Sequence, residues 1–573
     1  MKKILQKGDL FSALFFIGFF IGFCTLWSHV FYYQDQSSLF VFDTHYLNEY
    51  LIVPGGIIKI AASFITSFFH FKYLGALIIT LLALGISYLT KSIFKLKNHL
   101  FLVPALFIGL LHMYYMFDIY NTLSILIILI TIKALSRYSH KNYKYGILAA
   151  NVFLYYLAGP YMLIFALLFA ILLIKQKQII LSLTLLLSGV LLPYITYQFL
   201  IDIPLIHAYL NYLPAFDNIQ LIILLKYFLA AMLLLSILWG NLRKHNKYVT
   251  LAMALIIVGT VYKNHESTIA TQIRLDEAIY NQNWNKAISL MEDDFQNNKL
   301  SIFNYNYALL KSNQLNQKFF DIPQTLGVDG MILKATQEKD IMIKNSELYY
   351  TLGYFNEAHR WAYESMVING LTERALKIIV NTNLINGHNS RALKYVQILE
   401  KTLFTKEWAK KRRNLIETNS VASCPEYQSK IKLRTDEDYL YNNDRHDLYL
   451  KKLVEHPDNQ DALEILMMYY LLENNLSDFY RYYQKSKHFK NNSKLPKVYE
   501  EALLVYHVIL KDKNLNSPKL KRISKTTNTA FKQFAQKLSK VDNDITRRKK
   551  FLKKDFGNTY WYYLNVTNKK PIR

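Results

Sequence analysis

The chain has 573 residues, of which 52% are hydrophobic and 19% charged, and its formal net charge is +26. This apolar content, with only 19 Gly and 12 Pro, excludes a disordered or collagen-like chain. Two cysteines, Cys24 and Cys424, are too few for a disulfide scaffold or a multi-cysteine metal cluster.

Apolar runs crowd the chain up to about residue 263 and predict a multi-span membrane domain over residues 1–263. A helix that crosses a bilayer needs about 20 mainly apolar residues. Nine runs come near that length, some of them short: 10–31, 73–94, 100–117, 119–135, 147–157, 161–174, 179–200, 221–239 and 249–262. The first run is too long for the apolar core of a signal peptide, and eight more follow it.

Charge alternates between successive loops and predicts the orientation of the chain. Basic residues occupy the N-terminus and every second loop, at Lys2, Lys3, Lys7, Lys95, Lys97, Arg137, Lys141, Lys144, Lys175, Lys177, Arg243, Lys244 and Lys247. The other loops carry Asp35, Asp43, Glu49, Asp118, Asp202 and Asp217. Because basic loops stay in the cytoplasm, the N-terminus is predicted to be cytoplasmic and residues after 262 to lie outside. The Ile-, Lys-, Asn- and Tyr-rich composition is typical of low-GC bacteria, so we expect a bacterial inner-membrane protein with a periplasmic C-terminal domain.

Two stretches in this half are unusual. Runs 147–157 and 161–174 are separated only by Ala158-Gly159-Pro160, which favours either a helical hairpin or a broken pair that lines a cavity. The first outer loop, 32–72, contains Pro54-Gly55-Gly56 followed by a mixed polar and apolar stretch, 57–71. This stretch is typical of a helix that lies in the membrane interface.

Ionisable residues near the predicted outer face are the candidates for chemistry. Asp35 and Asp43 in the first outer loop could act as a general base, and such oxygens could also hold a divalent cation. Four further residues could contact substrate: His112, Asp118, His207 and Lys226. Lys226 lies inside the eighth run, where an ionisable group suggests function, although its side chain could also reach the interface. The alternative interpretation of Asp35 and Asp43 is that they are ordinary loop acids exposed to solvent.

This layout resembles the GT-C superfamily of multi-span glycosyltransferases, in which a cytoplasmic N-terminus precedes an acidic first outer loop and an interfacial helix. The resemblance implies a loop aspartate that activates the acceptor, here Asp35 or Asp43, and a polyprenyl-phosphate sugar as donor. The alternative is a non-catalytic, membrane-anchored scaffold for envelope proteins. A transporter is disfavoured because no inverted repeat is evident.

The second half, 264–573, predicts an all-helical array with short polar turns. Leu352–Ala358 recurs in form at Asn386–Ala392, and the two turn glycines, Gly353 and Gly387, are 34 residues apart. With Phe355, Ala358 and Ala392, these glycines resemble the tetratricopeptide-repeat family. The resemblance implies an α-solenoid whose concave face binds protein or peptide. The alternative is that these helices only cap the membrane domain.

The C-terminal segment combines many lysines and arginines with the aromatic run 560–563. Contact with anionic lipid, packing of a last helix, or a solvated charged face would each account for it, whereas nucleic acid is not expected outside the cytoplasm. The chain has no phosphate-binding glycine loop, nucleophile elbow or HExxH motif. We therefore expect any catalysis at the outer end of the membrane domain.

Overall fold

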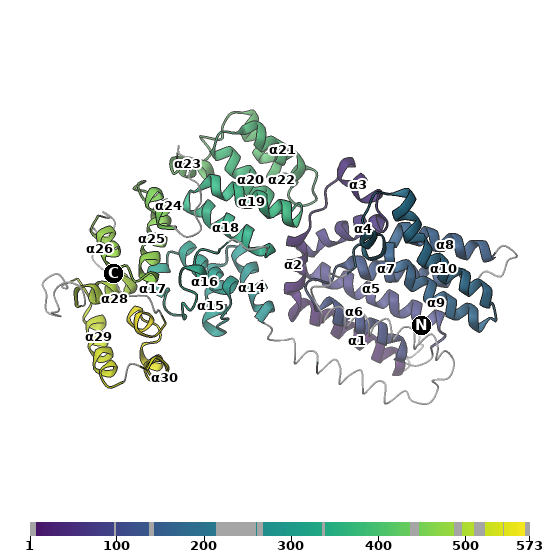
Figure 1. The fold of residues 1–573 in the computed structure, drawn as a ribbon, viewed down its shortest axis with the longest axis horizontal. Helices are drawn as coiled ribbons and strands as arrows, with labels where there is room; N and C mark the ends of the chain where they lie inside the picture. Colours follow the sequence, from purple (N-terminus) through teal and green to yellow (C-terminus); the bar gives the residue numbers. More distant parts are fainter. Residues whose placement is uncertain are drawn as a thin grey trace, which may run out of the picture. The chain divides into compact units, whose positions relative to one another are not determined.

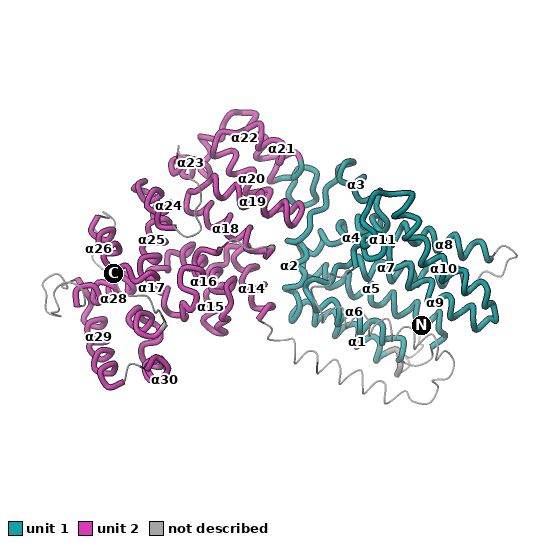
Figure 2. The backbone as a smooth tube through the Cα atoms, viewed as in Figure 1, with its two compact units in different colours: residues 1–267, 398–407 teal, residues 268–397, 408–573 magenta. Residues whose placement is uncertain are grey.

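The structure is a computed structural model of the whole chain. It describes residues 7–96, 99–136, 143–213, 259, 268–334, 338–435, 446–485, 495–508, 522–541 and 544–567. Within these ranges every regular element is a helix, which confirms the all-α class. Two compact units are formed: unit 1 holds Met1–Ser267 with Ile398–Glu407, and unit 2 holds Thr268–Gln397 with Trp408–Arg573 (Figure 2).

Unit 1 is a bundle of apolar helices with several short helices in the first loop (Figure 1). Its helices are α1 (Lys7–Thr25), α2 (Ser28–Ser37), α3 (Thr44–Leu51), α4 (Gly56–Ser67), η1 (Phe68–His70), α5 (Lys72–Ile93), η2 (His99–Leu102), α6 (Val103–His112), α7 (Ile119–Leu135), α8 (Tyr143–Ala158), η3 (Gly159–Tyr161), α9 (Met162–Lys175), α10 (Ile179–Ile195), η4 (Thr196–Leu200) and α11 (Leu205–Leu210).

The prediction of about nine membrane spans is wrong for the described residues. By length and composition alone, three helical stretches could cross a bilayer: Lys72–Ile93, Ile179–Leu200, and Lys144–Lys175, which consists of α8 and α9 joined at Gly159. A fourth is reached only if α1 and α2 count as one span, although they meet at 62°. The runs at 100–117 and 119–135 form helices of 10 to 17 residues, shorter than the roughly 20 that a crossing requires. The runs at 221–239 and 249–262 lie outside the described residues apart from Gly259.

The bend between α1 and α2 has a local cause. The backbone amides of Leu26 and Trp27 both donate to the Gly22 carbonyl, at 2.8 and 3.2 Å, which closes the helix there. The Trp27 ring then folds back onto Gly22, where a Cβ atom would lie only 2.7 Å from it. A glycine at this position therefore lets the indole pack against the helix it has just left.

The stretch Lys144–Lys175 reverses direction at Gly159, whose φ is 59°. Asn151 in α8 donates to Ser188 in α10 at 3.1 Å. The next residue of α10, Gly189, would place a Cβ atom 3.4 Å from Ala166 in α9. In a straight helix residues 151 and 166 would be about 22 Å apart, so both can meet α10 at one level only if α8 and α9 fold back on each other. This geometry favours the hairpin interpretation.

Unit 2 consists of helices joined by short turns. Its helices are α14 (Thr268–Tyr280), α15 (Trp284–Asp293), α16 (Lys299–Lys311), α17 (Leu315–Lys318), η5 (Gly327–Gly330), α18 (Lys339–Leu352), α19 (Phe355–Asn369), α20 (Glu373–Ile385), α21 (Asn389–Glu400), α22 (Lys406–Glu417), α23 (Pro425–Lys432), α24 (His446–Leu453), α25 (Gln460–Leu472), α26 (Leu476–Lys485), α28 (Lys497–Tyr506), α29 (Lys525–Leu538), α30 (Ile545–Phe556), α31 (Tyr560–Tyr562) and η8 (Tyr563–Thr567).

The two segments that carry the repeat match have the same local geometry. Gly353 ends α18 with φ 81°, and Gly387 follows α20 with φ 76°, in the left-handed region that favours glycine. Ala358 and Ala392, on the following helices, are fully buried. The Ser346 hydroxyl donates to the Ala358 carbonyl at 2.7 Å, a close approach of α18 and α19 that a small residue permits.

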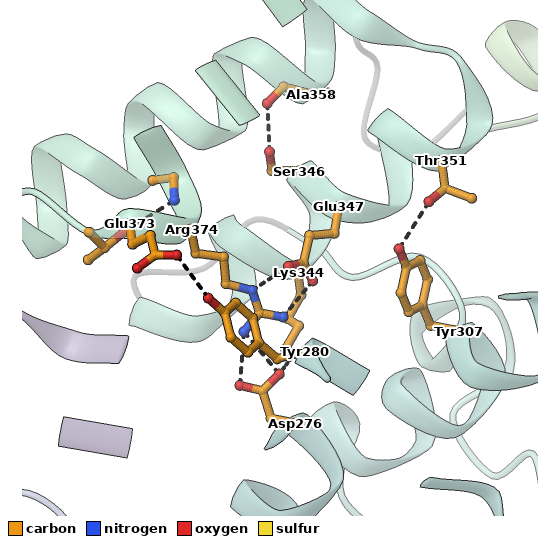
Figure 3. Close-up of polar contacts among 12 residues, drawn as sticks. Asp276, Tyr280, Tyr307, Lys344, Ser346, Glu347, Thr351, Ala358, Glu373 and Arg374 are labelled. Carbon is orange, nitrogen blue, oxygen red and sulfur yellow. Dashed lines mark hydrogen bonds and ion pairs between the residues drawn. The ribbon is translucent and has the colours of Figure 1, made fainter. Parts of the chain in front are cut away.

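A buried charge network joins α14, α18 and α20 (Figure 3). The Arg374 guanidinium donates to both carboxylate oxygens of Asp276, at 3.1 and 3.0 Å, and to Glu347 at 2.7 Å. Lys344 also contacts Asp276, while burial and the neighbouring Arg374 lower the pKa of its amine well below the ordinary value, so Arg374 is the main cation facing the two carboxylates. This pairing is required because an unpaired charge at this depth would be strongly destabilising.

The aromatic run near the C-terminus lies inside unit 2. Tyr560 is completely buried and Trp561 is 1% exposed. The Trp561 ring packs against Phe531 and Phe534 of α29, with ring centroids 5.3 and 6.0 Å away. Of the three interpretations of this segment, packing of the last helices is therefore the one that accounts for these rings, and an exposed aromatic belt is excluded.

Candidate functional site

Helix α4 carries a row of polar side chains through an apolar part of unit 1. It begins after Gly55, whose φ of 86° favours glycine, and it packs against α7 and α8. Lys59, Ser63, Thr66 and His70 recur at helical spacing and share one face of the α4–η1 run. We call these four residues the α4 stripe. Ser63 and Thr66 are each only 6% exposed, so this face is packed within unit 1, where the sequence predicted an interfacial helix.

Lys59, at one end of the α4 stripe, forms an ion pair with Asp118. Asp118 also caps α7, since its Oδ1 accepts the backbone N–H of Tyr120 at 2.8 Å. The Lys59 ammonium lies 5.9 Å from the centre of the Tyr212 ring. Asp118, predicted to bind substrate, is thus held by a cation and a helix terminus, and about a third of its side chain remains exposed.

His70, at the other end of the α4 stripe, lies 3.6 Å from the Asp35 carboxylate, measured from Nδ1 to Oδ2. The Gln36 amide donates to the same oxygen at 3.2 Å. Next to Asp35, the Gln34 amide donates to the Phe117 carbonyl at 2.8 Å, which ties the end of α2 to the loop that precedes Asp118. The eleven residues from Lys59 to His70 correspond to about 16 Å along a helix. Two contacts between a carboxylate and a basic side chain, Lys59–Asp118 and His70–Asp35, therefore lie at the two ends of one polar helix face.

The second predicted catalytic acid, Asp43, pairs with a residue far along the chain. Its carboxylate binds the Lys401 ammonium, and the hydrogen bond from Lys401 lowers the pKa of the Asp43 carboxyl below its ordinary value. The backbone amide of Phe42 donates to the Lys401 carbonyl at 2.7 Å. The Phe404 ring stacks on His70, with centroids 5.4 Å apart and planes 16° apart. Segment 398–407, which belongs to unit 1, thus contacts Asp43 directly and also contacts His70, the partner of Asp35.

Of the remaining predicted site residues, His112 lies beside this place, because its ring packs against Phe117, the residue before Asp118, with centroids 4.9 Å apart. His112 is 2% exposed, and its Nε2 lies 2.7 Å from the Thr122 hydroxyl, so it is a paired core histidine. His207 is exposed on α11. Lys226 lies outside the described residues. Within the described part of the chain, no group of three or more His, Cys, Asp or Glu side chains could hold a metal ion.

Residues 2–567 match a family of unknown function, DUF6057. The chain belongs to this family. Neither the curated proteins nor the solved structures contain a match to this DUF6057 protein.

Sequence reasoning on this DUF6057 protein missed four residues of the site. Lys59 and His70 were visible as polar residues in an apolar run, and their shared helical face with Ser63 and Thr66 was the signal that could have assigned them to a buried stripe. Lys401 and Phe404 carried no such signal. They lie more than 300 positions from the loop that they contact, and only the folded chain brings them there.

Proposed function

We propose that this protein is an integral membrane glycosyltransferase of the GT-C type, acting at the outer face of a bacterial inner membrane on a lipid-linked sugar. The observation that carries the proposal is the Asp35–His70 pair in the loop between the first apolar helix and the next long one. A carboxylate that is positioned by a neighbour and keeps 17% of its side chain exposed suits a general base.

In the proposed reaction, Asp35 accepts the proton of an acceptor hydroxyl. The hydroxyl oxygen forms a bond to the anomeric carbon of the donor sugar, and the bond from that carbon to the lipid phosphate breaks, so the lipid phosphate leaves with the bonding electrons. His70 is the residue that orients Asp35. Polyprenyl-phosphate sugar remains the proposed donor class.

The experiment is complementation of a deletion strain with single variants, each checked for expression. We expect Asp35→Asn to abolish complementation, because removal of a general base costs about 10²–10⁴-fold in rate. Asp202→Asn is the matched control, since Asp202 is an exposed loop acid in the same unit. Lys226→Ala tests the expected contact with the donor. Full complementation by Asp35→Asn would overturn the assignment of the base.

The second candidate is a non-catalytic scaffold in which the helical array of unit 2 binds an envelope protein. It is favoured by one observation: within unit 1, Lys401 pairs with Asp43, and Phe404 stacks on His70, the partner of Asp35, so both acids are engaged in contacts with other side chains or with a partner that is. Under this proposal the acids act as docking contacts. Asp35→Asn would then complement, whereas Lys401→Asp combined with Phe404→Ala would not.

A further inference from the structure

Unit 2 contains a cleft of about 970 Å³ that lies far along the chain from the α4 stripe. We call it the α29 cleft. Helices α28 and α29 contribute to its walls, and residues 555–561 at the end of α30 and the start of α31 complete them. This volume is at the upper end of the range of small-molecule sites, which is about 300–1,000 Å³.

The floor of the α29 cleft holds a buried acid, Glu501. It is 2% exposed, and one of its oxygens accepts the backbone N–H of Tyr560 at 2.7 Å. Within the described residues its other oxygen has no hydrogen-bond partner. Burial raises the pKa of the Glu501 carboxyl to about 8, against the opposing effects of the Tyr560 hydrogen bond and of Lys497. At neutral pH the free oxygen therefore carries a proton that it can donate.

The neighbouring groups on the cleft wall also offer donors. The Gln317 carbonyl oxygen accepts the backbone N–H of Lys497 at 3.1 Å, which leaves the Gln317 amide NH₂ as a donor. The Lys497 ammonium binds Asp321 and the Asn558 carbonyl, each at 3.0 Å, and keeps a third proton. Lys540 lines the cleft, is exposed and has no ion pair among the described residues.

The acids that share the α29 cleft are already satisfied. The Glu500 carboxylate accepts the backbone N–H and the hydroxyl of Ser524, at 3.1 and 2.7 Å, and also the Thr527 hydroxyl. Asp555 is paired with Lys537. Among the charged groups of the cleft, the capacity that remains for a ligand is therefore that of donors, with one unpaired cation, while the exposed amides of Gln533 and Gln536 can donate or accept.

We propose that the α29 cleft binds an acidic ligand, a molecule whose carboxylate or phosphate group accepts hydrogen bonds from Glu501, Gln317 and Lys497 and pairs with Lys540. Anionic acceptors complement such a cleft because hydrogen bonds to an ionised partner are the stronger ones. This site is independent of the proposed transferase chemistry in unit 1.

The test uses the purified full-length protein in detergent, with intrinsic tryptophan fluorescence and thermal unfolding as readouts. The probes are inorganic phosphate and glucuronate, with glucose as the uncharged control at constant ionic strength. We expect saturable responses to at least one acidic probe and none to glucose. The stronger response of the two tells whether phosphate or carboxylate is the preferred group.

Three variants make the result specific. Lys540→Gln should weaken binding about threefold, as expected for loss of one exposed charge pair. Lys553→Gln, an exposed lysine of α30 that does not line the cleft, should not. Glu501→Gln keeps a donor and should still bind glucuronate at pH 7. Wild-type affinity for glucuronate should fall from pH 7 to pH 9, as Glu501 loses its proton, and Glu501→Gln should remove this dependence.

The charged and polar groups that act on Glu501 are Lys497, Glu500, Asp321 and the Tyr560 amide. The carboxylate of glucuronate stays ionised from pH 7 to pH 9, so its own titration does not contribute to the change in affinity. Equal weakening by Lys540→Gln and Lys553→Gln would show nonspecific attraction to a basic surface and would overturn the proposal. So would the absence of a saturable response to both acidic probes in a protein that unfolds cooperatively.

Discussion

The Lys59 ammonium and the Asp118 carboxylate form an ion pair between residues 59 positions apart. The same carboxylate caps α7 through the Tyr120 amide, so one side chain joins α4 to the start of α7. Both side chains are partly buried, so removing one partner leaves the other charge in a place where water can replace it only in part. The pair therefore links the position of the α4 stripe to the helix that packs beside it.

The two roles of Asp118 can be separated by substitution. Asp118→Asn removes the charge and retains an oxygen for the Tyr120 amide, whereas Asp118→Ala removes both. We expect both variants to lower the midpoint of thermal unfolding in detergent, and Asp118→Ala to cost about 1 kcal/mol more, the value of an N-cap. Lys59→Gln combined with Asp118→Asn should be less destabilised than Lys59→Gln alone. Equal midpoints for Asn and Ala would contradict the capping role.

The Asp43–Lys401 contact predicts a charge-swap result. Asp43→Lys alone places two cations together and should reduce stability and complementation. Asp43→Lys with Lys401→Asp restores an opposite pair and should recover both, since a contact of this kind depends on charge complementarity more than on residue identity. If the double variant folds and is expressed but does not complement, the Asp43 carboxylate itself is required. Asp43 would then be a candidate for the catalytic base.

The network around Arg374 should dominate the stability of its part of unit 2. Arg374→Met leaves Asp276 and Glu347 with Lys344 as their nearest cation, and we expect a loss of about 3–5 kcal/mol. Arg374→Lys should recover only part of this loss, because an ammonium cannot form the two-pronged contacts of a guanidinium. Arg391→Met, at an exposed arginine of α21, is the control. The midpoint of urea unfolding reports the difference, and indistinguishable midpoints for Arg374→Met and Arg391→Met would show that the network is not required.

Glu501 predicts a pH dependence of stability with a defined sign. Its pKa rises from the ordinary 4.5 to about 8 in the folded protein, so between these values the folded state holds a proton that the unfolded chain releases. The contribution of Glu501 to the free energy of unfolding is fully present below about pH 4.5 and is lost as the pH rises towards 8. Burial also raises the pKa of Glu464, to about 7, which adds to the trend. Melting temperatures at pH 5, 6.5 and 8 should decline less steeply in Glu501→Gln than in the wild type, while Asp293→Asn, at an exposed acid, should follow the wild type.

The sequence alone determined the helical class, the apolar first half and the turn glycines of unit 2. Each of these rests on local properties: the length of an apolar run, or a backbone angle that favours glycine, as at Gly353 and Gly387. Counting spans failed where run length alone could not show a bend, as at Gly22 and Trp27, because that break depends on an indole that packs back onto its own helix.

The acids Asp35, Asp43 and Asp118 were found from the sequence, but their partners were not. His70, Lys401 and Lys59 are separated from them by 35, 358 and 59 positions, and no periodicity links residues over such distances. Only the packing of α4 against its neighbours, and of segment 398–407 on the first loop, decided which basic side chain meets which carboxylate. The physical reason is that helix formation depends on neighbours in the chain, whereas an ion pair depends on which surfaces are buried together.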